Sequence, residues 1–232
     1  AHNKCNLNYN LKKHFKLPVF FHNWKGYDGH LVISGLNKFG KDRISCIVQN
    51  QEKVSTLTLN NTIQFKDSMA FLSSSLDKLA KTMDKDDFKR MKERFGDKYE
   101  LMTQKGIMCY EYLTSPKRLE ETQLPSIEHF KSSLKEGENI TYAEYLRAKH
   151  IWNTFGCKTL GEYYHLYLEQ DVLLLADIFE KFRSVSLENY GIDPCWYISL
   201  PSFAWDCMLK ITGITLELLT DPNMYLMVEN GI

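Results

Sequence analysis

The sequence lacks a net charge, a long apolar run and any internal repeat. Its 29 lysines and arginines balance its 29 aspartates and glutamates. No overall positive field therefore indicates nucleic-acid binding, and any contact with DNA has to come from a local groove. No apolar run approaches the roughly 18 residues of a membrane-spanning helix, and no signal peptide opens the sequence. These absences predict an intracellular protein of the nucleus or cytoplasm that is neither secreted nor bound to a membrane.

Cysteines are few, and none of the six forms a C-x-x-C pair. Their spacing argues against a disulfide framework and predicts reduced, mostly buried thiols. Hydrophobic residues make up 44% of the chain of 232 residues. That content is enough for one large domain or for one domain with an appendage.

Apolar and β-branched runs predict a sheet in the first third of the chain. Residues 17–22 suit a buried strand, and residues 26–37 have the apolar spacing of a helix. Three further runs at 44–49, 54–59 and 62–66 are separated by polar residues. We expect these three runs to form an antiparallel meander.

Beyond the meander the period becomes helical. A serine at 73–75 suits the cap of a helix that reaches Met83, and the charged residues 86–95 suit a second helix. The order strand, helix, meander and then many helices predicts an α/β domain with a mixed sheet and surrounding helices, followed by a helical C-terminal segment.

Two capping boxes open later helices. Thr141 pairs with Glu144 in the first, which opens a helix to about residue 155, and Thr159 pairs with Glu162 in the second. The second helix is long and is expected to end near residue 190, where a domain boundary is predicted.

Two groups of polar side chains stand at positions that suit chemistry. Asn23, Tyr27 and Asp28 follow the first strand where a helix begins, although such an aspartate alone is more often a helix cap. Tyr167 and Asp171 are four residues apart on the long predicted helix, so they share one face. A phenol and a carboxylate so placed can orient a water molecule and hold a divalent metal, although both residue types are also ordinary in helices.

Both groups resemble motifs of a known family. FHNWKGYDGHL (21–31) and YLEQDVLLLADIFEKFR (167–183) closely resemble the second and third exonuclease motifs of family B DNA polymerases. The resemblance is to the protein-primed branch, which is found in phages, adenoviruses, linear plasmids and self-synthesising transposons.

Two further segments lie between these motifs in the order that the family requires. Ser75 and Leu76 resemble a motif that contacts the frayed single strand. Lys105 to Tyr110 resembles a K-x-x-hydrophobic motif with a tyrosine five residues beyond the lysine. The tail after residue 200 resembles the segment that leads into the polymerase domain, so the resemblance covers nearly the whole chain.

The resemblance implies an RNase H-like 3′–5′ exonuclease domain over residues 17–190. It implies that Asp171 helps to hold two catalytic Mg²⁺ or Mn²⁺ ions and that Asp28 acts through a metal-bound water. Tyr167 would orient the nucleophilic water, and Lys105 would steady the scissile phosphate. The residues implied to contact the 3′ end of single-stranded DNA are Asn23, Tyr27, Ser75, Leu76 and Tyr110.

The first exonuclease motif of the family, a D-x-E on an early strand, has no counterpart, because no aspartate precedes Asp28. Without those carboxylates the segment is expected to be a poor nuclease. The polymerase motifs are also absent, so the resemblance implies a fragment of a DNA-directed DNA polymerase, a nucleotidyltransferase of DNA replication. Deoxynucleotides and the terminal priming protein would bind through the absent polymerase domain, toward which residues 191–232 would lead.

His2 and Cys5 resemble the end of a zinc-binding module of some family members and of HNH-type endonucleases. Residues 1–16 would then be a remnant of that module, with half of a Zn²⁺ site. A lone H-x-x-C pair is usually no site at all, since zinc takes four ligands.

Other interpretations stay open. The chain can be a non-catalytic DNA-binding module or a degenerate transposon remnant that keeps the fold, and an intact D-x-E upstream would favour the enzyme instead. A stand-alone DEDD-type exonuclease is a third interpretation, against which the polymerase-like tail argues.

Overall fold

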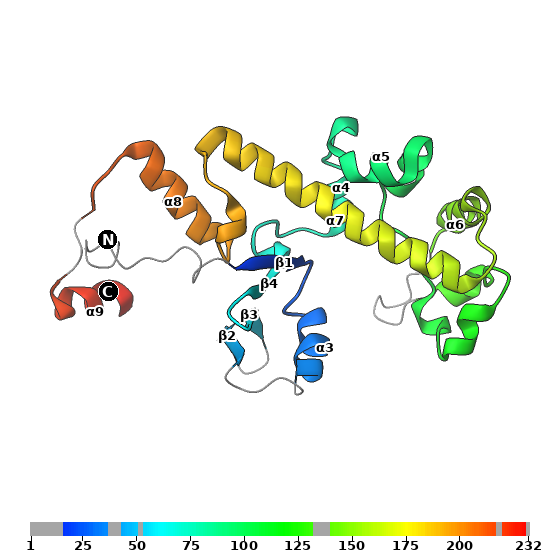
Figure 1. Ribbon diagram of the computed structural model, residues 1–232, viewed down its shortest axis with the longest axis horizontal. Helices are drawn as coiled ribbons and strands as arrows, with labels where there is room; N and C mark the ends of the chain where they lie inside the picture. The colour runs from blue at the N-terminus through cyan, green and yellow to red at the C-terminus, as the bar shows by residue number, and fades with distance from the viewer. Residues whose placement is uncertain (1–15, 37–42, 51–52, 132–139, 217–219, 231–232) are drawn as a thin grey trace.

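A four-stranded mixed sheet and a set of surrounding helices make up the described part of the chain (Figure 1). The computed structural model describes residues 16–36, 43–50, 53–131, 140–216 and 220–230. The strands are β1 (Leu17–Phe21), β2 (Ile44–Val48), β3 (Val54–Leu59) and β4 (Ile63–Asp67). In the order β1-β4-β3-β2, β1 runs parallel to β4, and the other two pairs are antiparallel. The predicted first strand, the meander and the mixed sheet of an α/β fold are therefore confirmed.

The helices are α3 (Asp28–Gly35), α4 (Leu76–Ala80), α5 (Lys89–Phe95), α6 (Tyr142–Phe155), α7 (Leu160–Tyr190), α8 (Leu200–Thr212) and α9 (Pro222–Asn230). The 3₁₀ turns are η3 (Ser68–Ala70), η4 (Lys85–Asp87), η5 (Gly96–Met102), η6 (Tyr110–Tyr112), η7 (Pro116–Glu120), η8 (Ile127–Phe130) and η9 (Pro194–Trp196). At 31 residues, α7 is about 46 Å long, and it runs past the sheet and most of the other helices (Figure 1). None of the helices in these ranges has both the length and the apolar character needed to span a membrane.

The two faces of β1 pack against different helices. Phe21 packs on Trp24 in the cluster that α3 covers. Phe20 packs on Phe179 of α7, with ring centroids 4.1 Å apart. Because successive side chains of a strand point to opposite faces, α3 and α7 cover opposite sides of the sheet.

Local capping signals set the ends of the long helices. Thr141 Oγ1 accepts a hydrogen bond from Glu144 N at 3.2 Å, and Glu144 Oε2 accepts one from Thr141 N at 2.7 Å. At α7, Thr159 Oγ1 accepts from Glu162 N at 3.2 Å, and the helix ends at Gly191 with a φ of 61°. The predicted ends near residues 155 and 190 are confirmed, and the predicted helical C-terminal segment contains α8 and α9.

The predicted helices between residues 73 and 95 are partly wrong. Ser75 caps α4 as expected, but α4 ends at Ala80 rather than Met83, because the Thr82 hydroxyl donates to the Leu79 carbonyl and the chain turns. The charged stretch begins with the 3₁₀ turn η4, which its own capping box at Asp84 starts. Only then does α5 begin.

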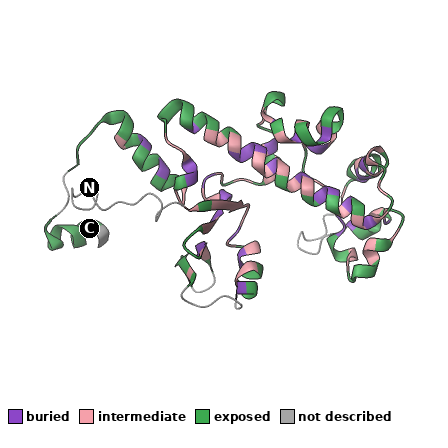
Figure 2. Cartoon of the chain, viewed as in Figure 1, coloured by how far each residue is buried: buried purple, intermediate pink, exposed green. Residues whose placement is uncertain are grey.

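Asp177 fixes the start of α5 on α7. Its side chain is fully buried, and its two carboxylate oxygens accept hydrogen bonds from Arg90 N and Met91 N, both at 3.0 Å. The largest hydrophobic cluster lies along the same helix. Figure 2 shows this buried face of α7 and the mostly exposed surfaces of α8 and α9.

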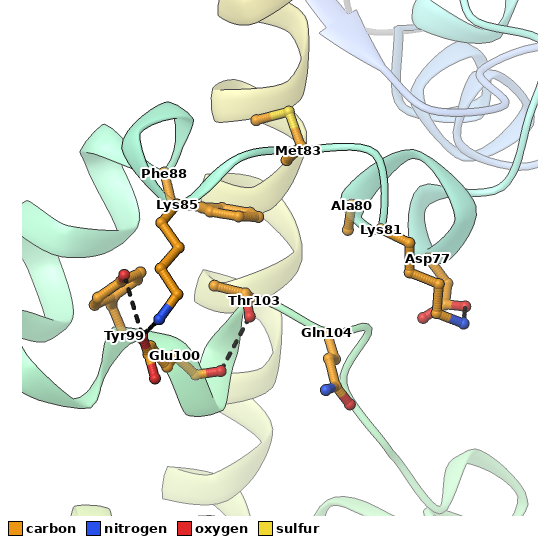
Figure 3. Close-up of a pocket in the computed structure, with 10 residues that line it drawn as sticks. All are labelled: Asp77, Ala80, Lys81, Met83, Lys85, Phe88, Tyr99, Glu100, Thr103 and Gln104. Carbon is orange, nitrogen blue, oxygen red and sulfur yellow. Dashed lines mark hydrogen bonds and ion pairs between the residues drawn. The ribbon is translucent and has the colours of Figure 1, made fainter.

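A pocket of about 370 Å³ opens between α4 and the turn η5 (Figure 3). Its two lysines are already paired: Lys81 with Asp77 and Lys85 with Glu100, each at 2.6 Å. The pocket therefore offers an apolar floor but no unpaired lysine for an anion.

Lys66 lies in the sheet on β4 and is buried. Its ammonium donates hydrogen bonds to the carbonyls of Cys195 at 2.5 Å and Tyr197 at 2.9 Å. These bonds hold the chain that follows α7 against the sheet. Burial lowers the pKa of Lys66 from 10.5 to about 8.

Replacing Lys66 by Met tests this buried charge. Because the folded protein releases the Lys66 proton near pH 8 and the unfolded chain only near pH 10.5, the wild type should gain stability relative to Lys66→Met as the pH rises through this window. Urea unfolding of both proteins across the window measures the difference. Lys158→Met is the matched control for the loss of one positive charge, because Lys158 is exposed. If the difference in unfolding free energy between the wild type and Lys66→Met did not change with pH, the result would contradict the buried charge.

Candidate active site

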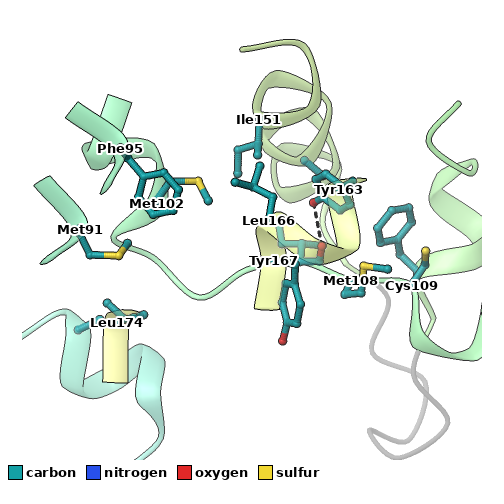
Figure 4. Packing of buried hydrophobic residues seen from close by; sticks show 14 of the residues in the cluster. Met91, Phe95, Met102, Met108, Cys109, Ile151, Tyr163, Leu166, Tyr167 and Leu174 are labelled. Atoms are coloured by element: carbon teal, nitrogen blue, oxygen red, sulfur yellow. Dashed lines mark hydrogen bonds between the residues drawn. The ribbon is translucent and has the colours of Figure 1, made fainter. Parts of the chain in front are cut away.

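Tyr167 and Asp171 lie one turn apart on α7, as predicted, and a third side chain joins them. The hydroxyl of Tyr110 donates a hydrogen bond to the hydroxyl of Tyr167. Tyr167 in turn hydrogen-bonds the carboxylate of Asp171. Figure 4 shows the Tyr167 ring leaving the hydrophobic cluster with its hydroxyl directed away from it. The three groups thus form a hydrogen-bonded row that runs from the half-exposed Tyr110 to the helix surface.

Burial sets the protonation of this row. It raises the pKa of Asp171, while the Tyr167 hydrogen bond and the positive charge of Lys105 act in the opposite direction. Burial and the neighbouring Asp171 carboxylate together raise the pKa of Tyr167 far above neutral pH. Tyr167 therefore stays a protonated donor, and it keeps Asp171 as its acceptor.

One oxygen of Asp171 is unsatisfied. Oδ1 is buried and has no hydrogen-bond partner in the described part of the chain. A buried carboxylate oxygen without a donor is costly unless a cation compensates it, so Asp171 fits the role of a ligand to a divalent metal. The described residues contain no group of three or more His, Cys, Asp and Glu side chains that could hold a metal ion. Asp171 would therefore need carboxylates from outside these residues to complete a site.

Lys105 reaches this site on an irregular segment next to α7. The neighbouring Gly106 packs directly on Tyr167: a Cβ there would lie 2.4 Å from Cδ2 of the Tyr167 ring. Only glycine lets the backbone approach the ring so closely. The Lys105 side chain is exposed, and its ammonium makes no hydrogen bond or ion pair with any described residue. Its charge acts on the pKa of both Asp171 and His22.

His22 is a site residue that the sequence did not reveal. It directly follows β1, and its ring bonds Ser68 Oγ at 2.9 Å and the Ser74 carbonyl at 3.0 Å. Burial lowers its pKa, so the ring is neutral at pH 7. These bonds join the end of β1 to the loop before α4. The sequence signal that could have revealed His22 was its position at the end of the predicted strand, directly before Asn23.

The polar group after β1 is built around Asn23, which has a φ of 68°. Its carbonyl accepts hydrogen bonds from Gly26 N and Tyr27 N at 3.0 and 3.2 Å. Asp67, a second residue that sequence analysis missed, accepts from Asn23 N at 2.9 Å. A buried acceptor at the end of β4 thus stabilises the sharp turn that delivers this group.

Asp28 is the first residue of α3, and it is not the N-cap, which is Tyr27. Tyr27 is 63% exposed and is therefore accessible to a ligand. No hydrogen bond or ion pair among the described residues joins Asp28 to Asp171, and their helices cover opposite faces of the sheet. The convergence of these two carboxylates stays a prediction.

The strand-contact candidates Ser75 and Leu76 begin α4. Ser75 is exposed, and its hydroxyl accepts a hydrogen bond from Lys78 N at 3.4 Å, so it serves as the helix cap. A cap at a helix start can still face a ligand, because its hydroxyl keeps a donor proton. The predicted zinc residues His2 and Cys5 lie outside the described residues.

A protein-family model described as DNA polymerase type B, organellar and viral, matches residues 9–227. The matched range contains all four segments on which the resemblance rests and the whole sheet. Searches among curated proteins and among solved structures gave no significant match.

Replacing each of two aspartates on α7 by asparagine should change the free energy of unfolding in opposite directions. Asp171→Asn removes a poorly satisfied buried charge, so it should raise the free energy of unfolding at pH 7 by about 1 kcal/mol. Asp177→Asn replaces an acceptor oxygen that faces a backbone N–H by an NH₂ donor, so it should lower the free energy of unfolding by about 2 kcal/mol. Urea denaturation measures both.

The gain for Asp171→Asn should shrink at acidic pH. Because the folded-state pKa of Asp171 is raised, the wild-type carboxyl takes up a proton as the pH falls and loses its destabilising charge. A destabilised Asp171→Asn variant at pH 7 would show that this carboxylate is structurally satisfied.

Proposed function

The chain belongs to the organellar and viral type B DNA polymerases, and we propose that its residues 17–190 form most of the 3′–5′ proofreading exonuclease domain of a protein-primed member. The observation that carries this proposal is the meeting of Lys105, Tyr110, Tyr167 and Asp171. Tyr110 and Tyr167 lie 57 residues apart in the sequence, yet their hydroxyls are hydrogen-bonded.

The chemistry of these groups suits removal of a nucleotide from a 3′ end. Asp171 supplies one ligand for a pair of Mg²⁺ or Mn²⁺ ions, which when bound stabilise the attacking and leaving oxygens. Tyr167, held as a donor, orients the attacking water. The exposed ammonium of Lys105, which is unpaired within the described ranges, steadies the negative charge of the scissile phosphate.

The frayed single strand is held by the residues around this row. Tyr110 and Tyr27 are 58% and 63% exposed, so their rings are open to stacking with bases. Asn23, Ser75 and Leu76 contribute polar and apolar contacts at the start of α3 and α4. Asp28 would contribute to the metal site through a water molecule rather than as a direct ligand.

The chain by itself is a poor nuclease under this proposal. The described residues supply no complete set of metal ligands, and no D-x-E precedes Asp28. Polymerisation, deoxynucleotide binding and contact with a priming protein belong to other parts of a longer polymerase. A second candidate function, a non-catalytic module that only binds single-stranded DNA, is favoured by the same lack of ligands.

In a polymerase that contains these residues together with a D-x-E motif, Asp171→Ala should slow digestion of single-stranded 3′ ends on the order of 100-fold. Polymerisation on a matched primer should stay unchanged, since Asp171 would contact only the exonuclease strand. A gel assay of primer shortening and extension measures both activities. Digestion at the wild-type rate would rule out Asp171 as a metal ligand.

Lys105 should govern binding of single-stranded DNA by the chain itself. Lys105→Met removes one phosphate contact, so the affinity for a fluorescent oligonucleotide should fall about fivefold and the salt dependence should weaken by roughly 0.7 in slope. Fluorescence anisotropy at several salt concentrations measures both effects. Lys81→Met is the matched control, because Lys81 is already paired with Asp77. Equal losses for the two variants would indicate non-specific charge rather than a phosphate contact.

A further inference from the structure

The segment that carries Lys105 is held by side chains rather than by regular structure. Residues 103–109 lie between η5 and η6 and belong to no helix or strand. Backbone carbonyls of such a segment have no partners from a ladder or a helix, so each needs another donor when it is buried. Four carbonyls in the stretch of residues 102–107, called here the 102–107 segment, receive donors from α6 and α7.

The donors are three side chains. Gln170 Nε2 donates to the carbonyls of Met102 at 2.8 Å and Gln104 at 2.6 Å. Arg147 Nη2, from α6, donates to the carbonyl of Lys105 itself at 2.5 Å. The Tyr163 hydroxyl donates to the carbonyl of Ile107 at 2.8 Å (Figure 4).

Two of these donors, Tyr163 and Gln170, stand on α7, the helix that carries the candidate catalytic pair. Tyr163, Tyr167 and Gln170 are spaced at i, i+4 and i+7 on α7, so they form one stripe along its face. Gly106 rests on the Tyr167 ring in the middle of that stripe. Gln170 and Tyr163 are each only 2% exposed, so neither is free to leave its carbonyl for water. The same helix therefore fixes Asp171 and the backbone beside it.

We propose that Gln170, Arg147 and Tyr163 are positioning residues for Lys105. They hold the 102–107 segment in register on α6 and α7, so that Lys105 and Tyr110 face the Tyr167–Asp171 pair. Because the ammonium of Lys105 has no partner among the described residues, its position depends on the backbone that carries it. A binding or catalytic site loses much of its activity when its groups are held about 1 Å too loosely. The proposal rests on the proposed function, because it assumes that Lys105 contacts the phosphate.

Tyr163→Phe tests the positioning with a minimal change. It deletes one hydroxyl and leaves the carbonyl of Ile107 without its donor. Tyr145→Phe is the matched control, since Tyr145 is also a buried tyrosine whose hydroxyl donates to a backbone carbonyl, that of Pro125, at 2.9 Å. Both variants lose one buried hydrogen bond of the same kind, but only Tyr163 donates to the 102–107 segment.

The readout is single-stranded oligonucleotide binding by the 232-residue chain, in a double-mutant cycle with Lys105→Met. Tyr163→Phe should weaken binding about threefold in the wild-type background and should have no effect in the Lys105→Met background. Tyr145→Phe should leave binding unchanged in both. Arg147→Met should weaken binding in the same Lys105-dependent way, and Arg147→Lys, which keeps a donor, should restore most of it.

A second variant acts without removing a donor. Gly106→Ala places a Cβ against the Tyr167 ring, so the 102–107 segment has to shift, and binding should weaken in a Lys105-dependent way. Gly35→Ala is its control, because a Cβ at Gly35 has no heavy atom within 4 Å. Amide hydrogen exchange should quicken over residues 103–107 in Tyr163→Phe and Gly106→Ala, and in neither control.

The outcomes separate this inference from the function on which it rests. If Lys105→Met binds the oligonucleotide as well as the wild type, the phosphate contact is wrong and the proposed function loses its support. Unchanged hydrogen exchange in Tyr163→Phe would then overturn the positioning as well. If Lys105→Met weakens binding and Tyr163→Phe weakens it further in the Lys105→Met background, only the positioning role is overturned.

Discussion

The described structure depends on one constraint: α7 must bury an apolar face from Leu160 to Phe179 while it keeps Tyr167 and Asp171 at a polar site. Its middle and N-terminal turns carry the largest hydrophobic cluster, and Phe179 closes one face of the sheet. A helix so firmly packed can hold a side chain in an unfavourable environment, because the local cost is small against the apolar burial. Tyr167 and Asp171 therefore stand on a well-packed helix, and Lys105 lies on the irregular segment beside it.

Two aspartates on this helix show the difference between a satisfied carboxylate and an available one. Asp177 is fully buried, yet both of its oxygens accept backbone amide protons at the start of α5. Asp171 is less buried, yet its Oδ1 has no partner among the described residues. Selection for stability alone would favour a hydrogen-bond donor for this oxygen or the replacement of Asp171 by another residue. The contrast supports a functional reason for Asp171 and a structural one for Asp177.

Local signals in the sequence predicted the fold better than they predicted the site. The capping box at Thr141, the cap at Thr159 and the apolar run at residues 17–22 act over a few residues, so their helices and strand appeared where expected. The predicted box at Thr159 is only half formed, because Glu162 Oε2 accepts from Lys158 N at 2.7 Å instead of from Thr159 N. The family motifs also marked Lys105, Tyr110, Tyr167 and Asp171, which the structure brings together. By contrast, His22 and Asp67 act through partners more than 40 residues away. No local pattern reports such contacts, and the same holds for Gln170, whose two bonds join residues over 60 positions apart.

The distribution of positive charge decides which part of this surface suits a phosphate. Lys81 and Lys85, in the pocket beside α4, are each neutralised by an acid at 2.6 Å. Lys105 has no such partner among the described residues, and backbone carbonyls around it accept hydrogen bonds from Gln170, Arg147 and Tyr163. A phosphate is drawn to a free cation more than to a neutralised pair, since an ion pair has to be broken before it can bind. The described residues thus hold more of the groups proposed to contact a strand than of those proposed to hold a metal, and strand binding is the property that both candidate functions share.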